Sequence, residues 1–324
     1  MKIRVIDRLR HAARRFRSMA PPCGVILAYH SIADRGADPH SLCVSAAHFQ
    51  QHLEALATDK ISVLPLDVFV ERLRARKRLR NAVVITFDDG YADNLHQAQP
   101  SLQRHGMPAT LFVVTGYLGQ SELWWDELER IVFCCPEPPA TLSIEIGGKE
   151  IHWQAAGDAD RARYRLHQAL YAPLRSLAEG ARRSCLDQLQ RWSGAPPRPA
   201  GTRTVMNADD LRLWAGAGLD VGAHSVSHPV MAQLPPEDQL QELQGSKTVV
   251  GDLLGRPVTS FAYPYGSYSL ETCSLAKQAG FGWACSLGND AVWSNSDIFH
   301  LPRMLVGDWD GETFARLLRW VMSG

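Results

Sequence analysis

Residues 82–91 read AVVITFDDGY, and this stretch indicates the architecture more clearly than any other. It begins as a continuous apolar run, which is typical of a strand buried on both faces of a parallel sheet. Asp88 and Asp89 directly follow the run, and Gly90 permits a turn there. Two adjacent carboxylates resist joint ionisation unless a cation or a basic group intervenes. We therefore expect one acid to bind a metal and the other to act as a base, and a helix N-cap acid is the alternative interpretation.

Outward from this stretch, β-rich runs alternate with amphipathic helical stretches. The predicted strands are Val25–Tyr29, Ser62–Leu64, Val83–Phe87, Ala109–Val113, Leu219–Ala223, Ser260–Tyr263 and Gly282–Cys285. The predicted helices are Ala47–Ala57, Asp67–Arg76, Asn94–His105, Ala208–Ala217, Pro236–Leu254, Ser269–Ala279 and Gly311–Val321. This alternation predicts an α/β fold with a mostly parallel sheet, and about seven strand–helix units favour a barrel over an open sheet.

Two segments depart from this pattern. Residues 119–203 have few strand signals, an Arg-rich helical middle and a proline-rich end, so we expect a helical insertion on one barrel loop. Residues 1–22 predict a basic amphipathic helix, which is either a solvated terminal helix or a peripheral contact with the inner membrane surface. The catalytic barrel is then expected over 23–324, with its core motifs from residue 82 onward.

Composition excludes several classes of protein. The 324 residues carry 34 Lys and Arg against 34 Asp and Glu, and a chain without excess positive charge is a poor candidate for nucleic-acid binding. Seven cysteines without a C-x-x-C pair favour free thiols in a reducing compartment. The charged N-terminal residues lack the apolar stretch of a signal peptide. We therefore expect a cytoplasmic protein, membrane-associated if its N-terminal helix contacts lipid.

Two further motifs also follow predicted strands. In LDVGAHSVSHP (219–229), His224 and His228 have a spacing that recurs among zinc ligands. Together with Asp89 they form a two-His, one-carboxylate set, which leaves coordination positions open for water and substrate. In SFAYPYG (260–266), the backbone N–H of Tyr265 is a candidate donor to an oxyanion, although such a segment is also a common turn.

TFDDGY, H-S-x-x-H and Y-P-Y-G, in this order, resemble the polysaccharide deacetylase family, also called carbohydrate esterase family 4 or the NodB-homology domain. The likeness includes YHSI near residue 30 and covers most of 25–318. It implies a distorted (β/α) barrel that hydrolyses N- or O-acetyl groups of a polysaccharide or an exopolysaccharide intermediate. It also implies that Asp88 is the general base, that Asp89, His224 and His228 bind a divalent metal, usually zinc, and that Tyr265 supplies the oxyanion donor.

The sequence departs from the family pattern at two positions. Many members have an arginine that orients the base where this chain has Ala262, so we expect Arg303 to replace it and to pair with Asp88. The usual L-x-H motif that supplies the general acid is also missing. His300 is the nearest candidate for that acid, and a protonated Asp88 is the alternative.

Two more residues are candidates for substrate contact. His30 ends a predicted strand that faces the same rim as the motifs, and Trp125 opens the insertion, where an indole face can stack on a sugar. Core packing is the competing interpretation of Trp125.

Two other functions remain alternatives. The first is a related hydrolase of a non-sugar amide or imide, although such relatives tend to lose the FDDG acids. The second is a catalytically silent glycan-binding protein, against which the intact metal set argues.

Overall fold

The computed structural model describes residues 22–34, 36–77, 79, 81–198 and 204–323. The main sheet contains β1 (Gly24–Tyr29), β4 (Ser62–Val63), β5 (Ala82–Phe87), β6 (Thr110–Val113), β9 (Asp220–Ala223), β10 (Ser260–Ala262), β11 (Trp283–Cys285) and β12 (Met304–Leu305). All strand pairs in it are parallel, in the order β11-β10-β9-β6-β5-β1-β12, and β4 pairs with β5. The predicted strands are all present, whereas the two-residue β12 was not predicted.

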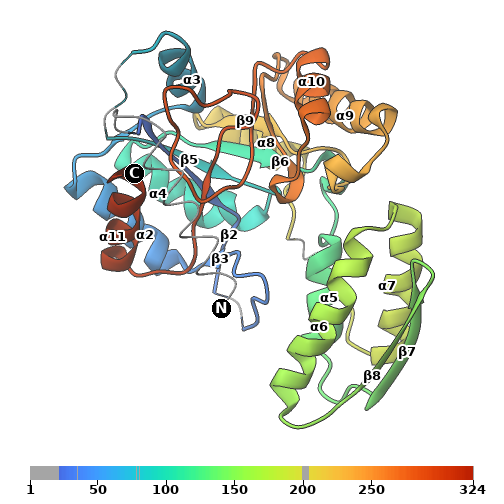
Figure 1. The fold of residues 1–324 in the computed structure, drawn as a ribbon. Coiled ribbons are helices and arrows are strands. Elements are labelled where there is room, and N and C mark those ends of the chain that lie inside the picture. Colours follow the sequence, from blue (N-terminus) through green and yellow to red (C-terminus); the bar gives the residue numbers. More distant parts are fainter. Residues whose placement is uncertain (1–21, 35, 78, 80, 199–203, 324) are drawn as a thin grey trace.

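Helices pack around this sheet (Figure 1). They are α2 (Ala46–Thr58), α3 (Leu66–Arg74), α4 (Gln99–His105), α8 (Ala208–Gly216), α9 (Pro236–Leu254), α10 (Leu270–Gln278) and α11 (Gly311–Ser323). Shorter elements are the π-helix η1 (Asn94–Ala98), the 3-10 turns η2 (Thr115–Tyr117), η3 (Met231–Gln233) and η4 (Pro264–Gly266), and the paired strands β2 (Ser31–Ile32) and β3 (Cys43–Val44).

The sheet curls into a half-barrel, and its strands β1 and β5 are buried along their whole length. Along β1, Leu27 packs in the cluster that contains the helical residues Leu53 and Phe314. Its neighbour Ile26 faces the other way, into a second cluster with Val84. This alternation places one core between the sheet and its outer helices and another inside the curve. The prediction of a distorted (β/α) barrel is confirmed.

The chain just before and within β12 links the two edges of the curled sheet. Leu301 forms a parallel bridge with Cys285 of β11, and Met304 pairs with Leu27 of β1. Arg303 lies between these two contacts, and its guanidinium donates to the hydroxyl of Thr86 on β5 at 3.1 Å. The segment that joins the edges therefore also carries a charged side chain into the interior of the half-barrel.

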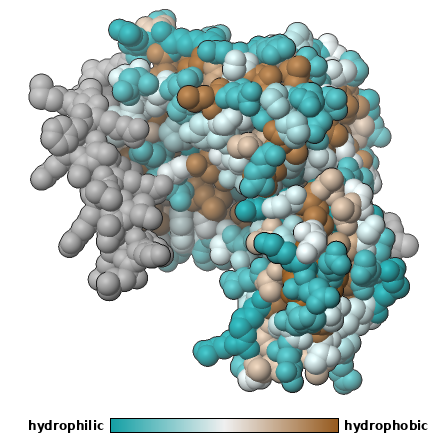
Figure 2. Space-filling view, turned by 45° about the vertical axis from the view of Figure 1, so that its right-hand side comes forward, coloured by the Kyte–Doolittle hydropathy of each residue, from teal (hydrophilic) through white to brown (hydrophobic). Residues whose placement is uncertain are grey.

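Residues 119–203 include a separate lobe that projects from the barrel (Figure 1). The lobe contains α5 (Trp124–Phe133), β7 (Thr141–Ile146), β8 (Lys149–Gln154), α6 (Ala159–Arg175) and α7 (Glu179–Ser193), and it has its own hydrophobic core. Hydrophilic side chains cover much of its face in Figure 2. The prediction of a helical insertion omitted the antiparallel β7–β8 hairpin, in which Gly147 and Gly148 have φ values of 59° and 76°.

The predicted N-terminal helix and its membrane contact fall on residues 1–21, outside the described residues. Within the described part, no helix combines the length and the apolar character needed to cross a bilayer. No disulfide bond joins cysteines within the described residues.

Candidate active site

Asp88 and Asp89 follow β5 at the carboxyl edge of the parallel sheet. The backbone N–H of Asp88 still donates to Tyr29 O of the neighbouring strand at 2.9 Å, so this residue extends the strand ladder. The chain then turns, because Asp89 and Gly90 have φ values of 72° and 80°. A left-handed φ is unfavourable for an aspartate, and such strain is concentrated at functional sites. The turn allows both carboxylates to reach the same buried site.

The loop that follows β9 presents His224 and His228. Its backbone is held by Glu242 of α9, whose carboxylate accepts hydrogen bonds from the N–H groups of Val226 and Ser227 at 2.7 and 2.9 Å. Inside the loop, the hydroxyl of Ser225 accepts from the N–H of His228 at 3.0 Å. These contacts fix a tight loop and turn both imidazoles toward Asp89.

The three predicted metal ligands converge. Oδ1 of Asp89 lies 3.5 Å from Nε2 of His224 and 3.4 Å from Nε2 of His228. Four-coordinate zinc with bonds of about 2.0–2.1 Å places neighbouring ligand atoms about 3.3 Å apart, so these spacings fit a single ion. All three side chains are buried, and burial lowers the pKa of both imidazoles, which keeps them neutral.

The backbone also fixes which nitrogen of His224 faces the ligand set. Nδ1 of His224 lies 2.7 Å from Ala262 O, so Nδ1 carries the proton and Nε2 keeps its lone pair. A carbonyl behind a ligating imidazole is the usual outer contact of zinc sites in proteins. The chemistry of the donors therefore fits a divalent metal.

Arg303 forms the ion pair with Asp88 that the sequence predicts. Two guanidinium nitrogens each donate to a different carboxylate oxygen of Asp88 at 2.7 Å. Arg303 and Asp88 are 0% and 1% exposed. Burial raises the pKa of Asp88, but the charge and hydrogen bonds of Arg303 act in the opposite direction and bring it to about 2. Asp88 is therefore ionised at neutral pH, as a base must be.

His30 lies at the same site, with Nε2 3.9 Å from Oδ2 of Asp88. The chain after it is held by Asp93, whose carboxylate accepts hydrogen bonds from Ser31 Oγ at 2.6 Å and from Ile32 N at 3.0 Å. Burial lowers the pKa of His30 to about 4, so its ring is neutral at pH 7. The structure thus brings His30 to the candidate base.

Two aromatic rings pack against His228. The Trp125 ring centroid lies 4.5 Å from that of His228, and the Tyr265 ring centroid lies 4.4 Å from it. Trp125 is only 3% exposed, and its indole N–H donates to the hydroxyl of Tyr91 at 2.9 Å. In this structure Trp125 supports a metal-ligand candidate and presents no open face for a sugar. Tyr265 has a φ of 57°, so its backbone also takes the left-handed conformation.

His300 is not brought into this group. Its ring stacks on Tyr268 with centroids 5.0 Å apart, and its Nε2 lies 3.8 Å from Asp297 on the same loop. About a third of the side chain is exposed. The sequence made His300 a candidate for the general acid, but its position in the structure does not support that role.

The residues that hold the metal-ligand candidates in position were not predicted from the sequence. Glu242 lies mid-helix and has no motif around it, so only the fold shows that it holds the His224–His228 loop. Tyr91 ends the first motif, but its contact with Trp125 depends on how the lobe packs.

Comparison with known proteins separates the barrel from the lobe. A model of the polysaccharide deacetylase family matches residues 75–133 and 199–284, so most of the lobe lies between the matched parts. The putative polysaccharide deacetylase YxkH of Bacillus subtilis is 21% identical, over 87% of this chain and 70% of that protein. Poly-beta-1,6-N-acetyl-D-glucosamine N-deacetylase of Staphylococcus aureus is 20% identical, over 86% of this chain and 71% of that protein.

Solved structures support the same fold. The deacetylase PplD of Streptococcus pyogenes, in complex with acetate, superposes with a TM-score of 0.63 and 17% identity, covering 94% of this chain and all of that one. IcaB from Ammonifex degensii superposes with a TM-score of 0.60 and 17% identity, covering 94% of this chain and 98% of that one.

Proposed function

Because the chain belongs to the polysaccharide deacetylase family, we propose that it is a metal-dependent hydrolase that removes N-acetyl groups from a polysaccharide. One relative is named as an N-deacetylase of poly-beta-1,6-N-acetyl-D-glucosamine, which favours an amide bond and a glycan substrate. The observation that carries the proposal is the position of Asp88. This carboxylate is held by Arg303, and its Oδ2 lies 3.9 Å from Nε2 of His224.

Asp89, His224 and His228 would hold the metal. Two neutral imidazoles and one carboxylate favour zinc among the abundant divalent ions. When bound, the ion supplies Lewis acidity toward the acetyl carbonyl and toward an attacking water.

The side chains around this set divide the remaining work. Asp88 accepts a proton from the attacking water, because Arg303 keeps its carboxylate ionised and fixes its direction. The backbone N–H of Tyr265 is the proposed donor to the oxyanion, and a donor of this kind is worth about 3–4 kcal/mol. The departing amine needs a proton. We assign the delivery of this proton to the protonated Asp88. Nε2 of His30 lies 3.9 Å from Oδ2 of the same carboxylate.

A groove beside the site has a lining suited to a glycan. It encloses about 580 Å³ between the α6–α7 connection and the chain that follows His228. Its polar lining side chains include Arg175, Glu179, Ser227, Gln233 and Gln241. Arg175 also lies over the ring of Tyr265, 5.2 Å from its centroid, so the groove lies next to the side chain of Tyr265. These side chains can donate hydrogen bonds to sugar hydroxyl groups or accept them.

The test measures acetate release from N-acetylated oligosaccharides after the purified chain has been loaded with zinc. Asp88→Asn should retain zinc and lose acetate release, because it removes the base and leaves the ligands. His228→Ala should lose acetate release together with the zinc ion held by Asp89, His224 and His228. His152→Gln, at an exposed histidine of β8, is the matched control and should change neither. Full turnover by Asp88→Asn would disprove the assignment of the base, and acetate release from O-acetylated glycans alone would disprove the amide substrate.

The two alternatives have less support. The FDDG acids that relatives acting on non-sugar amides tend to lose are both present here. A silent glycan-binding protein has no need for a buried base that is held in place by an arginine.

A further inference from the structure

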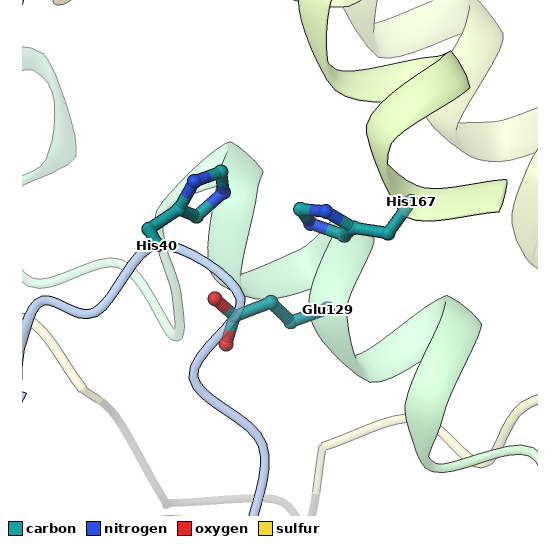
Figure 3. Close-up of side chains that lie close together, drawn as sticks. All are labelled: His40, Glu129 and His167. Atoms are coloured by element: carbon teal, nitrogen blue, oxygen red, sulfur yellow. The ribbon is translucent and has the colours of Figure 1, made fainter. Parts of the chain in front are cut away.

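A second group of metal-ligand side chains lies outside the candidate active site. His40, Glu129 and His167 each offer a ligand atom, and these atoms lie within 4.8 Å of one another. Figure 3 shows the three side chains pointing toward a common space. None of the sequence motifs includes them, and they are far apart along the chain.

The three residues come from three different elements. His40 lies in the loop between β2 and β3, where the carboxylate of Asp38 accepts hydrogen bonds from the N–H groups of Leu42 and Cys43 at 3.0 and 2.8 Å. Glu129 lies on α5 and His167 on α6, both within the lobe. The group therefore bridges a loop of the barrel and two helices of the lobe.

The imidazoles have unsatisfied atoms at this point. Nε2 of His40 and Nε2 of His167 are both buried, and neither has a hydrogen-bond partner among the described residues. His167 is 1% exposed, so solvent does not satisfy its ring. Unpaired buried polar atoms are few in folded proteins, and each one calls for an explanation such as a water or an ion. Here two of them lie beside a carboxylate.

We propose that His40, Glu129 and His167 bind a second divalent transition-metal ion, with zinc the preferred occupant. Bonds of about 2.0–2.2 Å to zinc place ligand atoms about 3.3–3.6 Å apart. The atoms here must close by at most about 1.5 Å from their present limit of 4.8 Å. Glu129 has a flexible side chain and His40 lies in a loop, so this adjustment needs no change in the helices. Two imidazoles and one carboxylate are ligands that suit zinc better than magnesium or calcium.

Burial also lowers the pKa of both imidazoles. Each ring is then neutral at pH 7 and has a lone pair for a metal. This supports the geometric argument and does not replace it.

The site would fix the lobe against the barrel next to the active site. α6 continues from His167 through Tyr171 to Arg175, one and two turns further on. The ring centroids of Tyr171 and His40 lie 4.1 Å apart, and the guanidinium of Arg175 lies over the ring of Tyr265. An ion held by His40 and α6 would therefore set the position of the helix that lines the glycan groove. The inference rests on these contacts and is independent of the reaction proposed above.

The experiment counts zinc ions per chain in the full-length protein by elemental analysis after dialysis. The wild-type chain should bind two. His40→Gln and Glu129→Gln should each bind one, and His228→Ala should also bind one, because it loses the other site. The double variant His40→Gln with His228→Ala should bind none. His152→Gln, the exposed histidine of the lobe, should still bind two.

A second measurement protects the test against a variant that folds poorly. In the His228→Ala background, zinc should raise the midpoint of thermal unfolding, and adding Glu129→Gln should abolish this rise while circular dichroism stays unchanged. A single zinc per wild-type chain that disappears in His228→Ala would overturn the second site and leave the proposed function standing. Two zinc ions retained in both His40→Gln and Glu129→Gln would also overturn it.

Discussion

The ion pair between Arg303 and Asp88 should be among the strongest single contacts in the half-barrel. Both side chains are almost fully buried, and two N–O contacts of 2.7 Å join them. At a charge separation of about 4 Å and an effective dielectric constant of about 20, the attraction is about 4 kcal/mol. Arg303→Met removes this attraction and leaves the Asp88 carboxylate buried alone, so we expect the free energy of unfolding to fall by about 3–5 kcal/mol.

The assay is a double-mutant cycle measured by urea unfolding of metal-free protein at pH 7. Arg303→Met, Asp88→Asn and the double variant are compared with wild type, and the double variant should lose clearly less than the sum of the single losses. The pKa of Asp88 in the folded chain, about 2, lies below its usual value of about 3.9. The pair therefore stabilises the fold above about pH 4, and this contribution disappears as the pH falls toward 2.

The matched control is a pair of similar length at the surface. Arg256 lies 2.6 Å from Asp220, but these side chains are 45% and 35% exposed. Arg256→Met should therefore cost no more than about 1 kcal/mol. Equal losses for Arg256→Met and Arg303→Met, or additive losses within the cycle, would refute the reasoning that burial makes the Arg303 pair strong.

Two further predictions concern the active site. His30→Gln should lower kcat for acetate release at least tenfold, because the His30 ring lies beside Asp88. His300→Gln should change kcat by less than about twofold. The opposite ranking of the two variants would restore His300 as the general acid. Glu242→Gln weakens the hydrogen bonds that hold the His224–His228 loop. The zinc affinity of the Asp89, His224 and His228 site should therefore fall about 10–100-fold in a competitive chelator titration. An unchanged affinity would show that Glu242 does not support the site.

Local patterns were sufficient to predict seven of the eight strands of the main sheet and the metal-ligand candidates. Each of the three motifs follows an apolar run, and the carboxyl ends of parallel strands lie at one edge of a sheet, so Asp89, His224 and His228 had to meet there. The pairing of Arg303 with Asp88 was predicted from the family resemblance, because Ala262 stands where many members have an arginine. It holds because the segment before β12 crosses the open side of the curled sheet.

Other features depended on packing that no local pattern contains. Trp125 was a candidate sugar platform, but contacts with Tyr91 and His228 bury it. The second metal-ligand group forms only because α6 of the lobe packs against the β2–β3 loop. The β7–β8 hairpin is a different case, since TLSIEI alternates apolar and polar residues before Gly147–Gly148, which is a recognised hairpin pattern.

The placement of Arg303 has a consequence for the order in which the enzyme becomes competent during synthesis. All three motifs lie before residue 267, yet the arginine that aligns the base arrives with residues 301–305. A nascent chain that has emerged only as far as the third motif already contains the metal-ligand candidates and Tyr265, the proposed oxyanion donor. Its base nevertheless lacks its partner until the last strand docks. Competence to cleave acetyl groups thus arises late, once the two ends of the barrel have met.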